Sequence, residues 1–184
     1  SDVCSSDLRA ILDDLAKVAN VDPRRVFATG MSNGAMMSYR LASELSDRIA
    51  AIAPVSGPMG TKECRPNRPV PVMHFHGDGD EFAPFKGGKG RGPSGTDFYS
   101  VQHSIDAWVA ANGCDKTPTT TRLVDRQDDG TTVRLVRYGS GKEGSEVVLV
   151  VIEGGGHTWP GKDPRMRSLG VSTRDISAND MMWE

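Results

Sequence analysis

The stretch of sequence that decides the fold reads VFATGMSNGAMM and occupies residues 26–37. Residues 26–29 are a short apolar run typical of a buried strand, and residues 35–45 return to helical composition. The pentapeptide GMSNG, residues 30–34, lies at the turn between them and matches the pattern G-x-S-x-G. Because such a turn lifts the serine hydroxyl clear of the sheet, we expect Ser32 to be a nucleophile. The alternative is a glycine-bounded turn in which the serine only caps the helix.

The neighbours of the serine have expected roles of their own. Gly30 and Gly34 should remove β-carbons that would collide with neighbouring backbone. A helix that starts near Asn33 points its free N–H groups and the positive end of its dipole at the serine, so we expect the Asn33 N–H to donate to an oxyanion. Met31, directly before the serine, is expected to contact the substrate.

The remaining apolar segments alternate between two periodicities. Helices are expected over residues 8–19 and 98–111, buried strands over 49–55, 70–75 and 146–152, and a hairpin over 120–124 and 132–136. Helices that alternate with buried strands indicate the α/β class, with a mostly parallel sheet covered by helices on both faces. In such sheets, sites gather at the carboxyl ends of the strands.

Composition limits the partners of the chain. The 184 residues are 37% apolar, which favours one globular domain. The net charge of −2 comes from scattered acidic and basic residues, so we expect neither nucleic acid nor a membrane surface as a partner. No apolar run approaches the roughly 20 residues that span a bilayer. The three cysteines lack the paired spacing of a zinc site.

A serine nucleophile needs a base that removes its proton, and the sequence has four histidines. His74 lies inside an apolar run and is expected in the core, while His103 lies on a polar helical face and is expected to be solvated. His76 ends a strand, where it could shape the site. His157 follows a strand and the glycines at 154–156, and it comes last in the order Ser, Asp, His, so we expect it to be the base. The alternative is a histidine in a glycine-rich surface loop.

The third member of the site should be a carboxylate that orients the base. Asp78, Asp80 and Glu81 all follow the strand that ends at residue 75. Gly79 favours Asp80, because it would let that side chain project away from the strand, but spacing hardly separates Asp80 from Asp78. The alternative for each acid is a solvated turn residue, which we expect for Asp78 and Glu81.

Three segments together resemble one enzyme family. They read ATGMSNGAMM at residues 28–37, HGDGD at 76–80 with Pro84 after it, and GGHTWPG at 155–161. These are similar to the secreted esterases of the α/β-hydrolase class that include polyhydroxybutyrate depolymerases and feruloyl or acetylxylan esterases. The resemblance spans residues 8–184.

The resemblance implies a role for each of three residues. It implies Ser32 as the nucleophile, Asp80 as the triad acid and His157 as the base, and it thereby selects Asp80 over Asp78. It also supports a disulfide between Cys64 and Cys114, which could bridge two loops in an oxidising compartment, and so a secreted, extracellular or periplasmic setting.

The sequence is also expected to depart from the family pattern at its two ends. Residues 8–184 are expected to form a single, incomplete catalytic domain, and residues 1–7 are expected to be unrelated sequence. Relatives carry N-terminal strands and an H-G-rich loop that donates a second oxyanion N–H, and we expect this chain to lack them. Residues 181–184 resemble the first turn of a last helix.

The predicted reaction is acyl transfer to water through an acyl-enzyme on Ser32. The expected substrate is a carboxylic ester, polymeric in the case of a polyester or a plant cell-wall ester, and no metal or organic cofactor is required. Trp159 is expected at the mouth of the pocket or, alternatively, as a loop anchor. Two other functions compete with this prediction: a serine peptidase of the same fold, and a catalytically inactive, truncated binding module.

Overall fold

The computed structural model describes residues 3–93, 95–164 and 166–183, so the expectations for Ser1, Asp2 and Glu184 lie outside the described residues. The elements are α1 (Val3–Val18), β1 (Phe27–Met31), α2 (Asn33–Glu44), β2 (Ala51–Val55), β3 (Val72–Gly77), β4 (Gly88–Lys89), β5 (Asp97–Phe98), α3 (Val101–Asn112), β6 (Thr119–Arg122), β7 (Thr132–Tyr138), β8 (Val147–Glu153) and α4 (Ala178–Trp183). Each helix and strand expected from the sequence is present, with ends that differ by a few residues.

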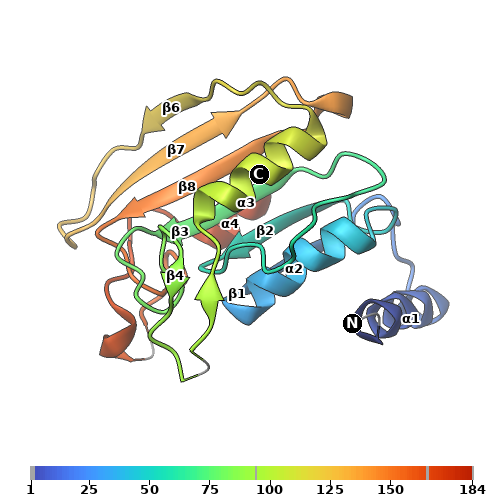
Figure 1. Ribbon diagram of the computed structural model, residues 1–184, viewed down its shortest axis with the longest axis horizontal. Coiled ribbons are helices and arrows are strands. Elements are labelled where there is room, and N and C mark those ends of the chain that lie inside the picture. Colours follow the sequence, from blue (N-terminus) through green and yellow to red (C-terminus); the bar gives the residue numbers. More distant parts are fainter. Residues whose placement is uncertain (1–2, 94, 165, 184) are drawn as a thin grey trace.

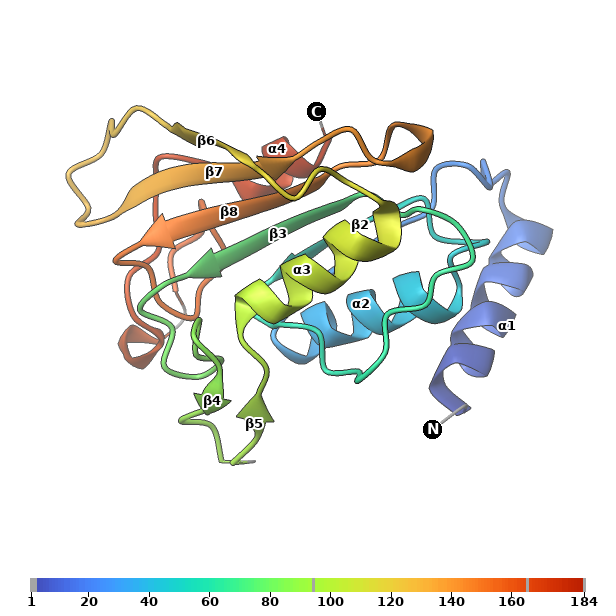
Figure 2. The ribbon, with the colours of Figure 1, turned by 45° about the horizontal axis from the view of Figure 1, so that its top comes forward.

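The main sheet has the strand order β1-β2-β3-β8-β7-β6 (Figure 1). Strands β1, β2, β3 and β8 run parallel, and the hairpin β6–β7 adds an antiparallel edge. The predicted, mostly parallel sheet is therefore confirmed. Figure 2 shows β3 and β8 pointing the same way, so the loops that follow them leave from one edge of the sheet.

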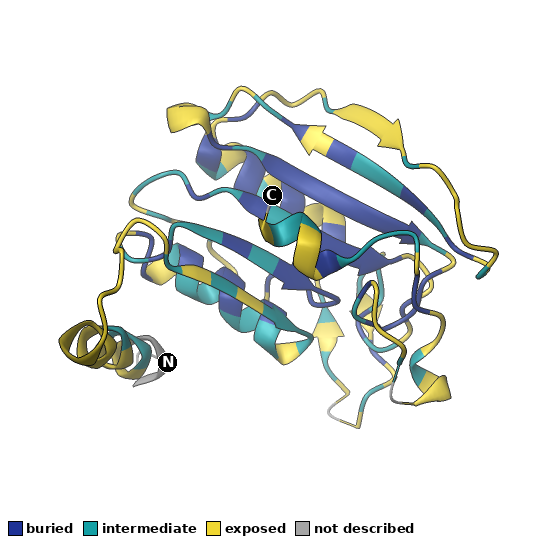
Figure 3. Ribbon diagram, turned by 180° about the vertical axis from the view of Figure 1, so that it is seen from behind, coloured by how far each residue is buried: buried dark blue, intermediate teal, exposed yellow. Residues whose placement is uncertain are grey.

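Strand β8 shows how the sheet is buried on both faces. Val147, Leu149 and Val151 pack into a cluster with α2 and α3, whereas Val148 and Val150 pack into a second cluster with α4. A strand covered on both faces is apolar throughout rather than alternating, which explains the continuous run in its sequence. Helices α2 and α3 lie on one side of the sheet and α4 on the other, as predicted (Figures 2 and 3).

Helix α1 lies beside the sheet, at the edge of the molecule (Figure 1). It begins at Val3 and continues without a break through residue 8. Leu12 packs against the core from this helix, and Arg9 forms an ion pair with Asp47 at 3.0 Å. Apolar side chains on the helix that remain exposed are Ile11, Leu15 and Val18.

The turn between β1 and α2 contains two glycines, and the close packing of the backbone requires glycine at one of them. A β-carbon at Gly30 would lie 2.7 Å from the Gly34 carbonyl carbon, so only glycine fits at position 30 without a shift of backbone. A β-carbon at Gly34 would meet no atom within 4 Å. The expected collision is thus correct for Gly30 and wrong for Gly34.

We predict that Gly30→Ala destabilises the protein by about 1–3 kcal/mol, because the added methyl group must push the start of α2 away from β1. Gly34→Ala is the matched control, since its methyl group has room and alanine favours a helix by up to about 1 kcal/mol over glycine. Urea unfolding of both variants measures the difference. Equal stability of Gly30→Ala and the wild-type protein would contradict the described turn.

Candidate active site

Ser32 occupies a strained turn at the end of β1. Its backbone has φ 58° and ψ −115°, a conformation that costs a non-glycine residue on the order of 1–3 kcal/mol. The Ser32 N–H donates to the Val55 carbonyl at 2.9 Å, and the Ser32 carbonyl accepts from the Met36 N–H at 3.1 Å. The side chain makes no capping hydrogen bond to the helix. The alternative of a serine that caps the helix with its side chain is therefore wrong.

Asn33 is the first residue of α2 and is exposed. The N–H groups of a first helical turn have no acceptor within the helix, and the helix dipole adds partial positive charge there. These features favour the Asn33 N–H as an oxyanion donor, and that role stays a prediction.

Asp80 and His157 come together from two separate loops. The His157 Nδ1–H donates to Asp80 Oδ2 at 2.8 Å, and the Asp80 side chain is completely buried. The other carboxylate oxygen, Oδ1, accepts from the backbone N–H groups of Phe82 at 2.8 Å and Ala83 at 2.9 Å. Three donors thus hold one carboxylate, which fixes its orientation toward the imidazole.

A close backbone approach joins those two loops. The Gly79 N–H donates to the Gly155 carbonyl at 2.9 Å, and a β-carbon at Gly77 would lie 2.3 Å from that same oxygen. Asp78 adds a side-chain link, because its Oδ1 accepts from the Gly154 N–H at 2.7 Å. Asp78 is exposed as predicted, but it holds the neighbouring loop, a contact that the sequence did not reveal. The structure therefore gives Asp78 and Asp80 different partners.

The imidazole of His157 is held from several sides. The backbone N–H of His157 donates to the Leu169 carbonyl at 2.7 Å, and the backbone N–H of Gly156 donates to the Val171 carbonyl at 2.9 Å, so the loop under the ring is fixed. The Phe82 ring lies against the imidazole, with 5.4 Å between the ring centroids. His157 is buried, with 7% of its surface exposed, which argues against the alternative of a histidine in a glycine-rich surface loop.

Ser56 is a site residue that the sequence reasoning missed. It follows β2, is 1% exposed and has φ 49°. Its N–H donates to the Phe75 carbonyl, and its hydroxyl donates over 3.4 Å to the carbonyl of Thr158, next to the imidazole. The sequence signal that could have revealed Ser56 is the Ser-Gly-Pro turn directly after a buried strand, because the carboxyl ends of parallel strands lie at the same edge of the sheet. Ser56 connects the strand beside Ser32 to the loop that carries His157.

The other histidines lie as the sequence predicted, with one addition. His74 is fully buried and His103 is exposed, which confirms both expectations. His76 is 1% exposed, and its Nε2 lies 3.5 Å from Asp80 Oδ2. His76 Nδ1 pairs with His74 Nε2 at 2.9 Å, and His74 Nδ1 pairs with the Tyr39 hydroxyl at 2.9 Å. His76 is thus in contact with the site, and His74 and Tyr39 lie behind it.

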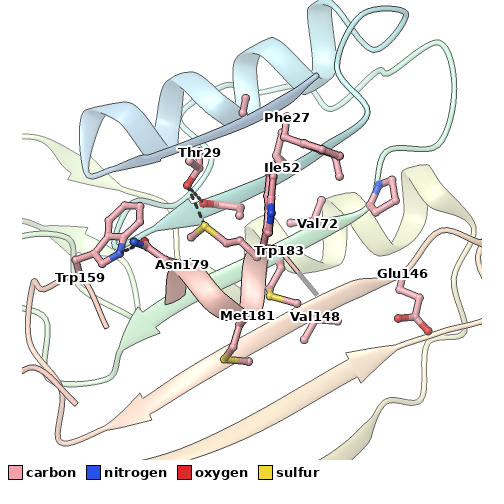
Figure 4. A pocket seen from close by; sticks show the side chains of 16 residues that line it. Phe27, Thr29, Ile52, Val72, Glu146, Val148, Trp159, Asn179, Met181 and Trp183 are labelled. Carbon is pink, nitrogen blue, oxygen red and sulfur yellow. Dashed lines mark hydrogen bonds between the residues drawn. The ribbon is translucent and has the colours of Figure 1, made fainter. Parts of the chain in front are cut away.

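Trp159 lines a cavity of about 410 Å³ on the α4 face of the sheet (Figure 4). Its Nε1–H donates to Asn179 Oδ1 at 2.9 Å, which ties the loop to α4 and supports the loop-anchor alternative. The cavity walls are formed by the apolar side chains of Phe27, Ile52, Val72, Val148, Met181 and Trp183. Met31 packs against the apolar cluster on this same face. Substrate contacts of Trp159 and Met31 stay predictions.

The expected disulfide is not formed, because Cys64 and Cys114 are both free thiols. Burial raises the pKa of the Cys64 thiol to about 12 and also raises the pKa of Cys114. The Cys114 Sγ–H is directed at the Ser145 carbonyl, 3.8 Å away.

Within residues 3–93, 95–164 and 166–183, no three His, Cys, Asp or Glu side chains gather as a metal ion would require. In the same part of the chain, no helix combines the length and the apolar character needed to cross a bilayer.

The buried histidines predict a pH dependence of stability. Burial lowers the pKa of His74 and His76 below the ordinary value of 6.5, so the folded protein keeps both rings neutral while the unfolded chain takes up protons. Their contribution to stability is complete above pH 6.5 and is lost as the pH falls below it. The free energy of unfolding should fall between pH 6.5 and 5 with a limiting slope of about 1.4 kcal/mol per pH unit for each ring.

Urea unfolding across this pH range measures that slope. His103→Asn is the matched control, because it replaces an exposed histidine and leaves both buried rings in place. A free energy of unfolding that stays constant from pH 6.5 to 5 would contradict neutral buried rings.

Comparisons with known proteins find one family and several proteins named as esterases that are similar to this chain. The sequence model of the dienelactone hydrolase family matches residues 1–109. NocK of Nocardia uniformis subsp. tsuyamanensis, an esterase by name, is 34% identical over 185 aligned residues, which cover 94% of this chain and 54% of that protein. Feruloyl esterase B of Piromyces equi is 30% identical over 156 residues, which cover 81% of this chain and 28% of that protein.

A solved structure supports the fold. The acetyl xylan esterase from Aspergillus awamori superposes with a TM-score of 0.57 at 18% identity, over 84% of this chain and 62% of that one. This likeness shows the α/β-hydrolase fold. The chain spans about half the length of NocK and a smaller share of feruloyl esterase B. The esterase part of the predicted resemblance is confirmed, and its polyhydroxybutyrate depolymerase part stays a prediction.

Proposed function

The chain belongs to the dienelactone hydrolase family, and from this premise we propose that it is a carboxylic ester hydrolase that forms an acyl-enzyme on Ser32. The observation that carries the proposal is the 2.8 Å hydrogen bond between His157 Nδ1 and the buried Asp80 carboxylate. It lies at the sheet edge where β1 ends in the strained Ser32 turn. A buried acid that holds one imidazole nitrogen leaves the other free to act as a base.

The proposed mechanism assigns one task to each group. His157 Nε2 takes the proton of the Ser32 hydroxyl as the serine oxygen attacks the ester carbonyl. The Asn33 N–H donates to the oxyanion of the tetrahedral intermediate, and Asp80 stabilises the imidazolium. His157 then gives its proton to the departing alcohol. Water activated by the same imidazole releases the acid and restores the serine.

The proposed substrates follow from the relatives. Proteins named feruloyl esterase and acetylxylan esterase match this chain, so we propose a feruloyl-type or acetyl-type ester, with a polyhydroxyalkanoate as the further substrate class. Trp159 and Met31 are the proposed substrate contacts. Export of the enzyme is also proposed, and because Cys64 and Cys114 are free, it rests on the family resemblance without a disulfide.

A fluorophosphonate probe tests the nucleophile. The wild-type chain should take up one equivalent of probe on Ser32, which peptide mass spectrometry locates. Ser32→Ala should take up none, and His157→Ala should react about a thousandfold more slowly, because no base activates the hydroxyl. His103→Ala, which replaces an exposed histidine, should label like the wild type. A folded wild-type chain that does not react would favour the inactive binding module.

Parallel assays separate esterase from peptidase. p-Nitrophenyl acetate and a methyl ferulate should be hydrolysed, whereas a peptide p-nitroanilide should not. Faster hydrolysis of the anilide than of both esters would overturn the proposed substrate class in favour of a peptidase, while leaving Ser32 as the nucleophile.

Substitution of the two neighbouring acids distinguishes their roles. Asp80→Asn should lower kcat by on the order of a thousandfold or more, because the amide no longer fixes the tautomer of the base or balances its charge. Asp78→Asn should lower kcat by less than about tenfold, because the Gly154 N–H loses only a strong acceptor at an exposed position. Steady-state kinetics on p-nitrophenyl acetate measure both. The opposite order would move the acid to Asp78.

A further inference from the structure

A continuous chain of buried hydrogen bonds runs from α2 to the turn after β3. The Tyr39 hydroxyl pairs with His74 Nδ1 at 2.9 Å, His74 Nε2 pairs with His76 Nδ1 at 2.9 Å, and His76 Nε2 pairs with the Ala83 carbonyl at 2.8 Å. The same His76 nitrogen lies 3.5 Å from Asp80 Oδ2. Each of these five residues is at most 4% exposed. The catalytic steps proposed above use none of the first three.

The backbone dictates this alignment. His74 and His76 are two residues apart on β3, so both side chains point to the same face of the sheet, where α2 supplies Tyr39. The rings stack, with centroids 5.7 Å apart for Tyr39 and His74 and 5.2 Å apart for His74 and His76. The interplanar angles are 27° and 18°, so neighbouring rings are close to parallel.

The proton positions follow from the last acceptor. The Ala83 carbonyl has no proton to give, so His76 Nε2 carries the hydrogen and His76 Nδ1 accepts. His74 Nε2 must then be the donor to His76 and His74 Nδ1 the acceptor, so the Tyr39 hydroxyl donates to it. With both rings neutral, a single arrangement satisfies every group. Every hydrogen bond in the row is therefore donated in the same direction, from Tyr39 toward the site.

We propose that Tyr39, His74 and His76 are positioning residues that hold the turn between Asp80 and Ala83, and with it the carboxylate that faces His157. This inference rests on the proposed function, in which Asp80 is the triad acid. Ala83 is held at both ends, since its carbonyl accepts from His76 and its N–H donates to Asp80 Oδ1. The core thus fixes the turn, and the turn fixes the carboxylate.

Several titratable groups surround this chain of hydrogen bonds. His76 faces His74 on its own strand, Asp80 in the turn and His157 from the loop after β8, and it also packs edge-on against Phe85. Tyr39 faces His74 from β3 and Cys64 from the loop between β2 and β3. Among these, Asp80 supplies a negative charge to the end of the chain. The neutral His76 ring gives its Nε2–H to the Ala83 carbonyl and lies 3.5 Å from that carboxylate without adding a charge to the site.

The test compares variants of His76 by kcat per active site, with sites counted by fluorophosphonate uptake. His76→Leu removes both ring nitrogens and should lower kcat by about tenfold, with little change in KM. The acid limb of the pH profile of kcat/KM should move to lower pH in this variant, because a loosely held Asp80 carboxylate stabilises the His157 imidazolium less. His76→Gln keeps an N–H that reaches Ala83 and should restore most of the loss. His103→Leu is the control and should behave like the wild type.

Tyr39→Phe is the second variant, since it deletes only the first donor. It should lower kcat per site by about threefold and shift the acid limb in the same direction. A purely structural role would change the number of active sites but neither of these readouts. Wild-type kcat and an unmoved acid limb in Tyr39→Phe and in folded His76→Leu would overturn the proposal. A His76→Gln variant whose kcat per active site is no higher than that of His76→Leu would also overturn it. If His76→Leu does not fold, the kcat and the acid limb of Tyr39→Phe decide whether the proposal stands.

Nitrogen NMR of histidine-labelled Ser32→Ala protein separates this proposal from the proposed function. His74 and His76 should both show a protonated Nε2 and an unprotonated Nδ1 at neutral pH. This pattern in a protein whose wild type hydrolyses no ester would sink the proposed function and leave the hydrogen-bond chain standing. A protonated Nδ1 on either ring in an active esterase would sink the chain alone.

Discussion

The Asp80–His157 hydrogen bond depends on how closely two loop backbones approach. The turn after β3 and the loop after β8 leave no room for a β-carbon at Gly77, where it would meet the Gly155 carbonyl oxygen at 2.3 Å. Because β3 and β8 are parallel neighbours, their ends already lie side by side, and glycine removes the last obstacle to contact. The Asp78 bond to Gly154 then closes the two loops on each other.

The same edge stores strain at two serines. Ser32 and Ser56, which follow the adjacent strands β1 and β2, both have positive φ. Such conformations persist only when the surrounding structure enforces them, and here the backbone bonds to Val55 and Phe75 do so. A sheet buried on both faces is rigid enough to hold these turns. The site therefore combines a rigid sheet with loops that are held together by side-chain hydrogen bonds and by close contacts at glycines.

The sequence predicted the elements well because their apolar patterns are strong. The strand-turn-helix around Ser32, the buried runs of β3 and β8 and the order Ser, Asp, His can all be read from the residues. Other features depend on three-dimensional contacts that the pattern does not contain. The Asp78 link, the role of Ser56 and the free state of Cys64 and Cys114 belong to this group. The alternation of His74 and His76 on one strand was a readable signal of a shared face, but their common partner, Tyr39, comes from a distant helix.

The central claim is that a hydroxyl, an imidazole and a carboxylate meet at one edge of the sheet. A crystal structure of the fluorophosphonate-treated protein tests it most directly. The account predicts phosphonate density on Ser32 Oγ, His157 Nε2 within roughly 2.6–3.2 Å of an adduct oxygen, and the Asp80–His157 bond intact. An adduct on another residue, or an imidazole turned away from the adduct, would contradict it.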